Sequence, residues 1–234
     1  MPAANLKPTL PLLLSLNAGF VDTAGFLALQ GLFTAHVTGN FVTLGASLVL
    51  GTSGAVAKLL ALPVFCLIVI LTRLLSSALL RAGRPALKII LSLKVILLVA
   101  GAVLAIRLGP FKNGDAWQAV VTGMVLVAAM AIQNAAHRIH LGSAPPSTLM
   151  TGTTTQIMID LADMVHAPKP ETTARPGARL LGMATNIAVF AAGCAAAALL
   201  YAHVGVWCFV VPPVLGAAAL FLRVAGETKA AEAK

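Results

Sequence analysis

Two short polar stretches interrupt an otherwise apolar chain, and each contains a threonine followed by a glycine. The first carries Thr38-Gly39-Asn40 and the second carries Thr151-Gly152-Thr153. Glycine permits a broken helix or a close backbone approach, and a threonine hydroxyl can bind an amide freed where a helix starts or breaks. A helix that begins here directs its positive end at whatever lies before it. Two such starts predict a site for an anion, a carboxylate or a dipolar solute, and ordinary helix packing is the alternative.

The two stretches also share a register. A shift of 151 − 38 = 113 residues places Thr38 on Thr151. The polar positions that this shift pairs are Asn40, Thr43 and Ser47 with Thr153, Gln156 and Asp160. Their spacing of i, i+3, i+7 places each set on one face of a helix. We expect both polar faces to point into the protein, with Gly39 and Gly152 near each other at the midplane.

A second group of polar residues lies in the apolar segments that precede these stretches. Asp22 lies midway along one of them, and an ionisable residue inside a membrane helix is a functional candidate. It could bind a cation, exchange a proton or pair with a residue such as Lys94; tying helices together is the alternative. Gln133 and Asn134 lie near the corresponding position of the second half when a gap of two residues is allowed, and with Arg138 they form a second polar group. With the two Thr-Gly stretches, these residues form the predicted substrate or ion site.

The composition identifies the class of protein. Hydrophobic residues make up 59% of the chain, charged residues 10%, and the mean hydropathy is +0.95. Soluble domains have about 45–50% apolar and about 25% charged residues, so we predict a polytopic protein whose first partner is the lipid bilayer. Lys and Arg outnumber Asp and Glu by 16 to 7. We attribute this excess to cytoplasmic loops and expect no nucleic-acid partner.

Six segments are long enough to span a bilayer as helices, which takes about 20 residues: 10–31, 57–80, 86–108, 116–137, 179–202 and 204–223. The short segments 34–51 and 148–165 are not. If each enters and leaves on one side, only Lys58, Arg107 and Lys112 lie at the outer face, which fits the positive-inside rule. We therefore predict an all-α membrane bundle of two inverted repeats, each with three spans plus one short half-helix or re-entrant segment. The single domain covers 1–234, with repeats at about 10–108 and 116–223.

Other features refine this plan. Ala184, Ala188, Ala192 and Ala196 recur every four residues, which predicts a face for close helix contact. Lys94 and Arg73 lie within apolar runs of the cytoplasmic half, where long side chains can reach the interface. The sequence has no nucleophile elbow, nucleotide-binding glycine pattern or metalloprotease motif. We expect no metal and no cofactor, and we favour a protein that is not an enzyme.

The chain resembles the YoaK family of bacterial multi-pass membrane proteins, a family of unknown function. The resemblance covers about 14–222 and rests on Gly19 with Asp22, on Thr38-Gly39-Asn40, on Gln133-Asn134 with Arg138, and on Met150-Thr151-Gly152. Thr153 stands where the family often has Asn. The resemblance implies a location in the bacterial inner membrane and supplies neither a substrate nor a reaction.

The function that best fits these patterns is a small-solute transporter or channel with a polar site between the repeats. A membrane-embedded enzyme, or an accessory or structural membrane protein, is the alternative. The solute or ion and its direction of movement stay open, and a homo-oligomer is compatible with this plan.

The inverted topology places the link 51–56 outside the cell and the link 167–178 in the cytoplasm. Ser53→Cys and Thr172→Cys, each on a background without the native cysteines 66, 194 and 208, test this with an impermeant maleimide on intact cells. We expect labelling at position 53 only. Labelling at 172 but not at 53 would contradict the topology.

Overall fold

The computed structural model describes residues 10–166 and 176–232, and within these ranges every element is helical. Along the chain these are α1 (Leu10–Ala28), α2 (Gly39–Leu50), α3 (Ala55–Arg81), α4 (Ala86–Leu108), α5 (Trp117–His140), α6 (Met150–His166), α7 (Pro176–Val204), the 3-10 helix η1 (Gly205–Val210) and α8 (Val211–Glu232). The prediction of an all-α protein is confirmed. Most of the link 167–178 lies outside the described residues.

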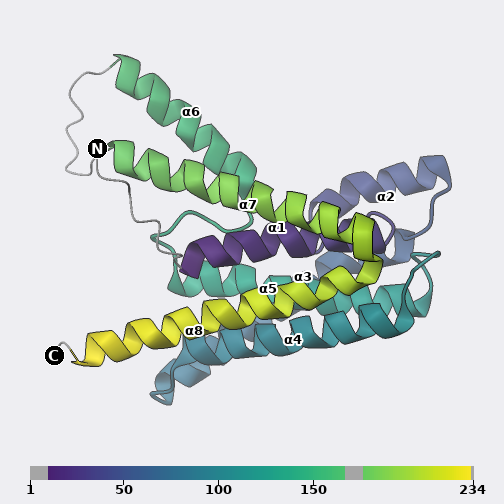
Figure 1. Ribbon diagram of the computed structural model, residues 1–234, viewed down its shortest axis with the longest axis horizontal. Helices are drawn as coiled ribbons and strands as arrows, with labels where there is room; N and C mark the ends of the chain where they lie inside the picture. Colours follow the sequence, from purple (N-terminus) through teal and green to yellow (C-terminus); the bar gives the residue numbers. More distant parts are fainter. Residues whose placement is uncertain (1–9, 167–175, 233–234) are drawn as a thin grey trace.

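Five helical runs in the described part of the chain are long and apolar enough to cross a membrane. Four are α1, α3, α4 and α5, and the fifth covers Arg179–Leu222. Its 44 residues are about twice the length that a span needs. Figure 1 shows α7 and α8 running in opposite directions on either side of η1. The run therefore folds back on itself, and the segment predicted at 204–223 begins as a 3-10 helix.

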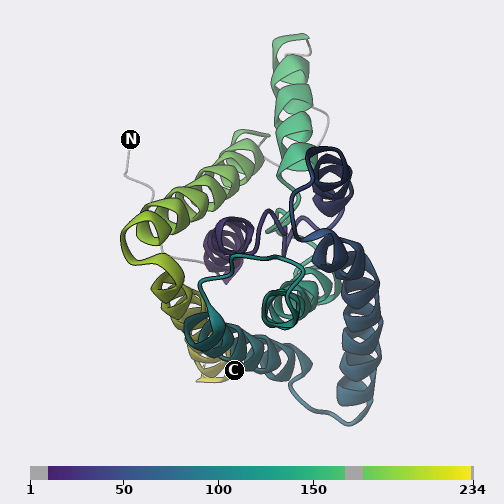
Figure 2. The ribbon, with the colours of Figure 1, turned by 90° about the vertical axis from the view of Figure 1, so that its right-hand side faces the viewer.

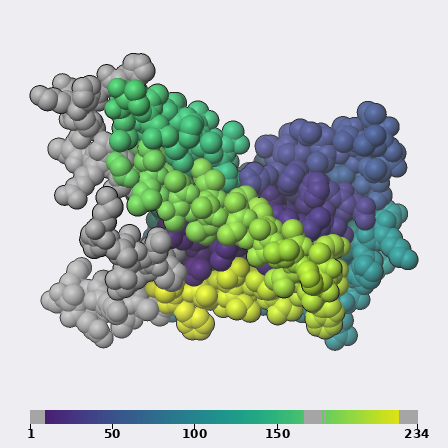
Figure 3. All heavy atoms as spheres, turned by 45° about the horizontal axis from the view of Figure 1, so that its top comes forward, coloured from purple at the N-terminus to yellow at the C-terminus, as the bar shows by residue number. Residues whose placement is uncertain are grey.

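Helices α1 and α5 lie in the centre of the bundle, which is clearest in the end view of Figure 2. Helix α1 packs against α7 and α8, whereas α5 packs against α3 and α4. The short helix α2 packs on α3, and α6 packs on α7. Figure 3 shows α2 and α6 on one face, toward opposite ends of the molecule. The most enclosed helices are thus those that carry Asp22 and Gln133.

Each short helix follows a non-helical segment that turns back along the helix before it. Residues 29–38 return from the end of α1 toward the middle of the bundle, and α2 then runs outward again (Figure 1). Residues 141–149 do the same between α5 and α6. The first reversal is built by Gln30 and Gly31, whose φ angles are 55° and 83°. Neither short helix reaches the 18 residues of a candidate span.

The contact between α1 and α7 depends on two glycines. A Cβ on Gly19 would overlap the carbonyl oxygen of Phe190, and one on Gly193 would overlap that of Leu16. The alanines at 184, 188 and 192 are exposed. The predicted alanine face is therefore not the face that packs most closely, because a glycine brings the backbones nearer than alanine can.

We predict that Gly193→Ala destabilises the protein by on the order of 1–3 kcal/mol, the usual effect of overpacking. Gly182→Ala on the same helix is the control, because a Cβ there meets no atom within 4 Å and alanine favours the helix. Thermal unfolding in detergent measures both. Equal melting temperatures for the two variants would show that α1 and α7 are not held this closely.

Candidate functional site

Asp22 binds the segment that folds back from α1. Its buried carboxylate accepts hydrogen bonds from the backbone N–H groups of Thr34 and Ala35, both at 2.7 Å. The Thr34 hydroxyl lies 3.3 Å from the same oxygen, Oδ1. The other oxygen, Oδ2, lies 2.6 Å from Nδ1 of His36. The partner of Asp22 is thus His36, and the carboxylate holds the returning chain against its own helix.

His36 lies close to both folded-back segments. Beyond its pairing with Asp22, it lies near the backbone of Thr148 in the second segment. Its ring packs edge-on against Phe190 of α7, with centroids 5.6 Å apart. His36 lies between α1 and α2, outside the spanning helices, and its hydrogen bond to Asp22 raises the pKa of the imidazole. The imidazole therefore keeps its proton to higher pH than a free histidine does.

Asn40 completes the first turn. Its buried amide accepts from the N–H of Phe33 at 2.9 Å and donates to the Phe33 carbonyl at 2.8 Å. Thr38 precedes α2 but makes no side-chain capping bond, and Gly39 lies against the Phe33 ring. The expectation that threonine hydroxyls satisfy the freed amides is wrong for Thr38, because Asp22 and Asn40 bind the peptide groups of this segment.

The second folded-back segment is held in a similar way by neutral side chains. Nε2 of the buried Gln133 donates to the Leu14 carbonyl at 2.9 Å and to the Ser147 hydroxyl at 3.0 Å. The Thr148 hydroxyl donates to Oδ1 of Asn134. In both halves the bonded side chains lie 14 residues apart. A shift of 113 residues places Thr34 on Ser147 but Asp22 on Ala135, so Asp22 corresponds to Gln133 or Asn134 only when a gap of one or two residues is allowed.

A cavity of about 570 Å³ opens beside Asp22 and His36. Phe26, Phe33, Phe190 and Leu27 give it apolar walls, whereas Thr23, Thr38, Gly39 and Cys194 complete the lining. Such a site, apolar with a few converging polar groups, is typical of small-molecule pockets. It suits a small solute with an apolar body and a cationic or hydrogen-bonding group. The described residues contain no group of three His, Cys, Asp or Glu that could hold a metal ion.

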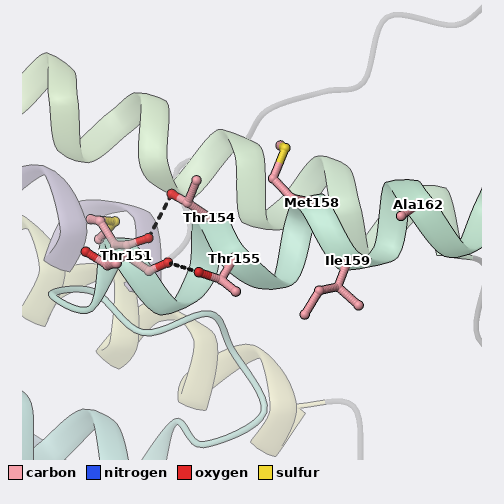
Figure 4. Close-up of a pocket in the computed structure, with 7 residues that line it drawn as sticks. Thr151, Thr154, Thr155, Met158, Ile159 and Ala162 are labelled. Atoms are coloured by element: carbon pink, nitrogen blue, oxygen red, sulfur yellow. Dashed lines mark hydrogen bonds between the residues drawn. The ribbon is translucent and has the colours of Figure 1, made fainter.

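The second Thr-Gly pair does not line the cavity beside Asp22. Thr151 and Gly152 are exposed at the start of α6, and Figure 4 shows Thr151, Thr154 and Thr155 along the outer face of that helix. The Thr154 and Thr155 hydroxyls donate to carbonyls one turn earlier, at 2.9 and 3.0 Å. This face forms a shallow groove of about 650 Å³ from α6 residues alone. The expected approach of the second pair to the interior is not seen at Thr151 and Gly152.

The two polar faces predicted on the short helices point only partly into the protein. Asn40, Ser47 and Thr153 are buried, Thr43 and Asp160 are half-buried, and Gln156 is exposed. The last residue of each polar face binds a basic residue of the next helix. Neither basic residue was among the predicted site residues. Nζ of Lys58 donates to Ser47 at 2.6 Å, and Arg179 forms an ion pair with Asp160 at 2.6 Å. Ser47 and Asp160 are positions that the 113-residue shift pairs.

Of the remaining predicted residues, Arg138 is exposed at the end of α5. His36, Phe190 and Cys194 line the cavity and were not among the residues predicted from the sequence. His36 carried a usable signal, since it lies two residues before Thr38 in a stretch already singled out. Phe190 and Cys194 carried none, because they belong to an ordinary apolar helix and reach the site only through the α1–α7 contact.

Comparison with known proteins gives the family. A family described as proteins of unknown function, DUF1275, matches residues 10–222. The chain belongs to this family. It is also similar to the UPF0700 transmembrane protein YoaK of Bacillus subtilis (strain 168), with 31% identity over 182 residues, covering 74% of this chain and 75% of YoaK. No solved structure gives a significant match. With five apolar helical runs, the chain is a multi-pass integral membrane protein, and the resemblance to the YoaK family is confirmed.

We predict that Asp22→Ala destabilises the protein by several kcal/mol, because each buried N–H left without a partner costs about 1–3 kcal/mol. Asp22→Asn retains one acceptor oxygen and should cost less. Thermal unfolding of purified protein measures both, with Thr155→Ala on the exposed face of α6 as the control. An Asp22→Ala variant as stable as the parent would mean that this carboxylate does not hold the 34–36 segment.

Proposed function

We propose that this protein is a transporter or channel for a small solute in the bacterial inner membrane, built from two inverted repeats of about 10–108 and 116–223. The solute site is the cavity beside Asp22 and His36. The observation that carries the proposal is the position of this cavity. Residues of α1, of the folded-back segment 29–38, of the start of α2 and of α7 line it, and many transporters with repeated architecture bind substrates and coupling ions beside such broken helices.

The packing of the helices supports the repeat. If α1 to α4 correspond to α5 to α8 in order, then the α1–α7 contact corresponds to α5–α3, and α4–α5 corresponds to α8–α1. The contacts of α2 with α3 and of α6 with α7 form another matching pair. The contacts between α1 and α5 and between α4 and α8 map onto themselves. This is the pattern that a two-fold axis between the halves would produce.

The side-chain contacts follow the same correspondence. In each half, the first helix binds the folded-back segment through side chains 14 residues apart. In each half, a basic residue of the third helix binds a polar residue late in the short helix, namely Lys58 to Ser47 and Arg179 to Asp160. An arrangement of this kind keeps irregular backbone away from lipid, which a bilayer requires.

The chemistry of the site favours coupling to protons. Asp22 accepts two backbone N–H bonds that do not depend on His36, so His36 can gain or lose a proton while the segment stays attached. A cationic solute in the cavity would replace the imidazolium as the partner of the carboxylate. Protonation and solute binding would then exclude one another, which is the basis of exchange. The contact of His36 with Thr148 would transmit this change to the second half.

A membrane-embedded enzyme is the second candidate, because Cys194, His36 and Asp22 line one cavity. A thiol, an imidazole and a carboxylate are the side chains of a cysteine-nucleophile site. Here, however, the Cys194 thiol lies near Thr23 and His36 lies near the backbone of Thr148. Cys194→Ser separates the two functions, since it would retain transport and abolish catalysis by the thiol.

The test is uptake by protein reconstituted in liposomes, using a solute first found by thermal-shift screening of metabolites. We expect an imposed pH gradient to drive uptake, and both Asp22→Asn and His36→Gln to reduce the rate at least tenfold. Thr155→Val, on the outer face of α6, should retain the parental rate. Melting curves verify that each variant is folded. Parental rates in folded Asp22→Asn and His36→Gln would exclude this site from the transport path.

A further inference from the structure

A second set of polar side chains lies in the centre of the bundle, away from the Asp22 cavity. Five buried side-chain atoms in the described residues have no hydrogen-bond partner: Nδ2 and Oδ1 of Asn17, Nζ of Lys94, Oε1 of Gln133 and Nδ1 of His137. Asn17 and Gln133 are 0% exposed and Lys94 is 1% exposed. The expectation that Lys94 reaches the membrane surface is therefore wrong. It does not pair with Asp22 either.

Helix geometry places Lys94 beside Gln133. Helices α4 and α5 are antiparallel neighbours, and Gly101 of α4 lies against Leu126 of α5, with 2.6 Å from an added Cβ to Leu126 Cδ2. Lys94 is seven residues before Gly101, and Gln133 is seven residues after Leu126. Because both helices rise by the same amount per residue and seven residues make about two turns, these two side chains lie at one level of the shared interface.

Asn17 reaches the same interior from α1. Its Nδ2 lies 3.7 Å from the position of a Cβ on Gly216 of α8, and that position also contacts Val95 and Leu98 of α4. Lys94 is one turn from Leu98 on α4. Gln133 bonds the carbonyl of Leu14, which lies one turn before Asn17. Three helices thus direct unpartnered polar atoms into one region enclosed by α1, α4, α5 and α8.

The atoms available there match the needs of a protonated amine. An ammonium group without an anion is very costly to bury unless acceptors surround it. Oδ1 of Asn17 and Oε1 of Gln133 are acceptors without a hydrogen-bond partner, and an ammonium group has three donors and no acceptor. A neutral Lys94 would instead accept from Nδ2 of Asn17. In this structure none of these atoms is within hydrogen-bonding distance of another, so a change of side-chain rotamer must bring the amide groups to the amine.

We propose that Lys94, Asn17 and Gln133 form a proton-binding site in the core of the bundle, separate from the Asp22–His36 pair. The step is the addition of one proton to the Lys94 amine, which gives an ammonium held by the two amide oxygens. It needs no other reactant. Other titratable groups lie near this site. On α5, His137 lies one turn from Gln133 on the same face, and its Nε2 interacts with the Ala144 carbonyl at 3.2 Å.

The remaining groups on neighbouring elements are engaged or exposed. Asp22 of α1 is bonded to the 34–36 segment, and Lys58 of α3 is bonded to Ser47. Cys66, Arg73 and Arg81 of α3, like Arg138 of α5, are exposed. Cys208 of η1 is buried, and His140 of α5 bonds Ser76. The described side chains of α8, residues 211–222, include none that titrates.

The test follows the protonation of Lys94 directly, in protein labelled with ¹³C,¹⁵N-lysine in lipid nanodiscs and without any solute. The signal that Lys94→Met removes is assigned to Lys94, and Lys88→Met, an exposed residue of the same helix, is the assignment control. Lys94→Gln serves the same purpose if the methionine variant does not fold. We expect the Lys94 Cε and Nζ signals to titrate over a pH range in which the fold is intact.

Asn17→Leu removes an acceptor without breaking any existing hydrogen bond, because both of its amide atoms are unpartnered. We expect its Lys94 titration midpoint to fall by roughly one pH unit, a tenfold loss of proton affinity. Gln156→Leu, on exposed α6, should leave the midpoint unchanged. A Lys94 signal that never titrates, or a midpoint unmoved by Asn17→Leu, would overturn the proposal. Neither outcome depends on solute transport, so this inference and the proposed function fail independently.

Discussion

A chain that reverses direction against a buried helix must find partners for its own backbone, and the described structure depends on how this chain meets that requirement. A buried N–H or carbonyl group left without a partner costs several kcal/mol. The segment 29–38 has such groups between α1 and α2. Asp22 accepts hydrogen bonds from the amides of Thr34 and Ala35. Asn40 binds both the N–H and the carbonyl group of Phe33. A single carboxylate on α1 thus determines where α2 can begin.

That requirement explains the position of the helices around it. Asp22 can reach the returning chain only if both are enclosed, and α7 provides one wall by crossing α1 at Gly19 and Gly193. The same crossing brings Phe190 and Cys194 to the cavity. In the second half, amide and hydroxyl groups of Gln133, Asn134, Ser147 and Thr148 replace the charged pair. The two folded-back segments are therefore held by different chemistry, and His36 of the first lies near Thr148 of the second.

The sequence was informative about elements and much less so about contacts. Long apolar runs predicted the spans because bilayer thickness fixes their length, and α4 begins and ends where expected, at Ala86 and Leu108. Asp22 was found because a charge is rare in such a run. His36 was missed because its role depends on a chain reversal at Gln30 and Gly31. The alanine repeat of α7 was misleading because spacing alone does not say which face meets α1. Lys94 was misplaced because the depth of a side chain depends on neighbours from other helices.

The difference between the halves has a consequence for mechanism. If both folded-back segments were held by neutral side chains, the site would have no preference for an ion or a proton. If both were held by carboxylates, two like charges would lie near each other, which is unfavourable in a medium of low dielectric constant. Here one half carries Asp22 and the other carries Asn134 in the corresponding region. One carboxylate between two similar halves can hold one unit of positive charge at a time, whether on His36 or on a solute. In the proposed transporter, a structural similarity of the halves would allow the protein to change the side that is open, while their chemical difference would set how much charge crosses with each change.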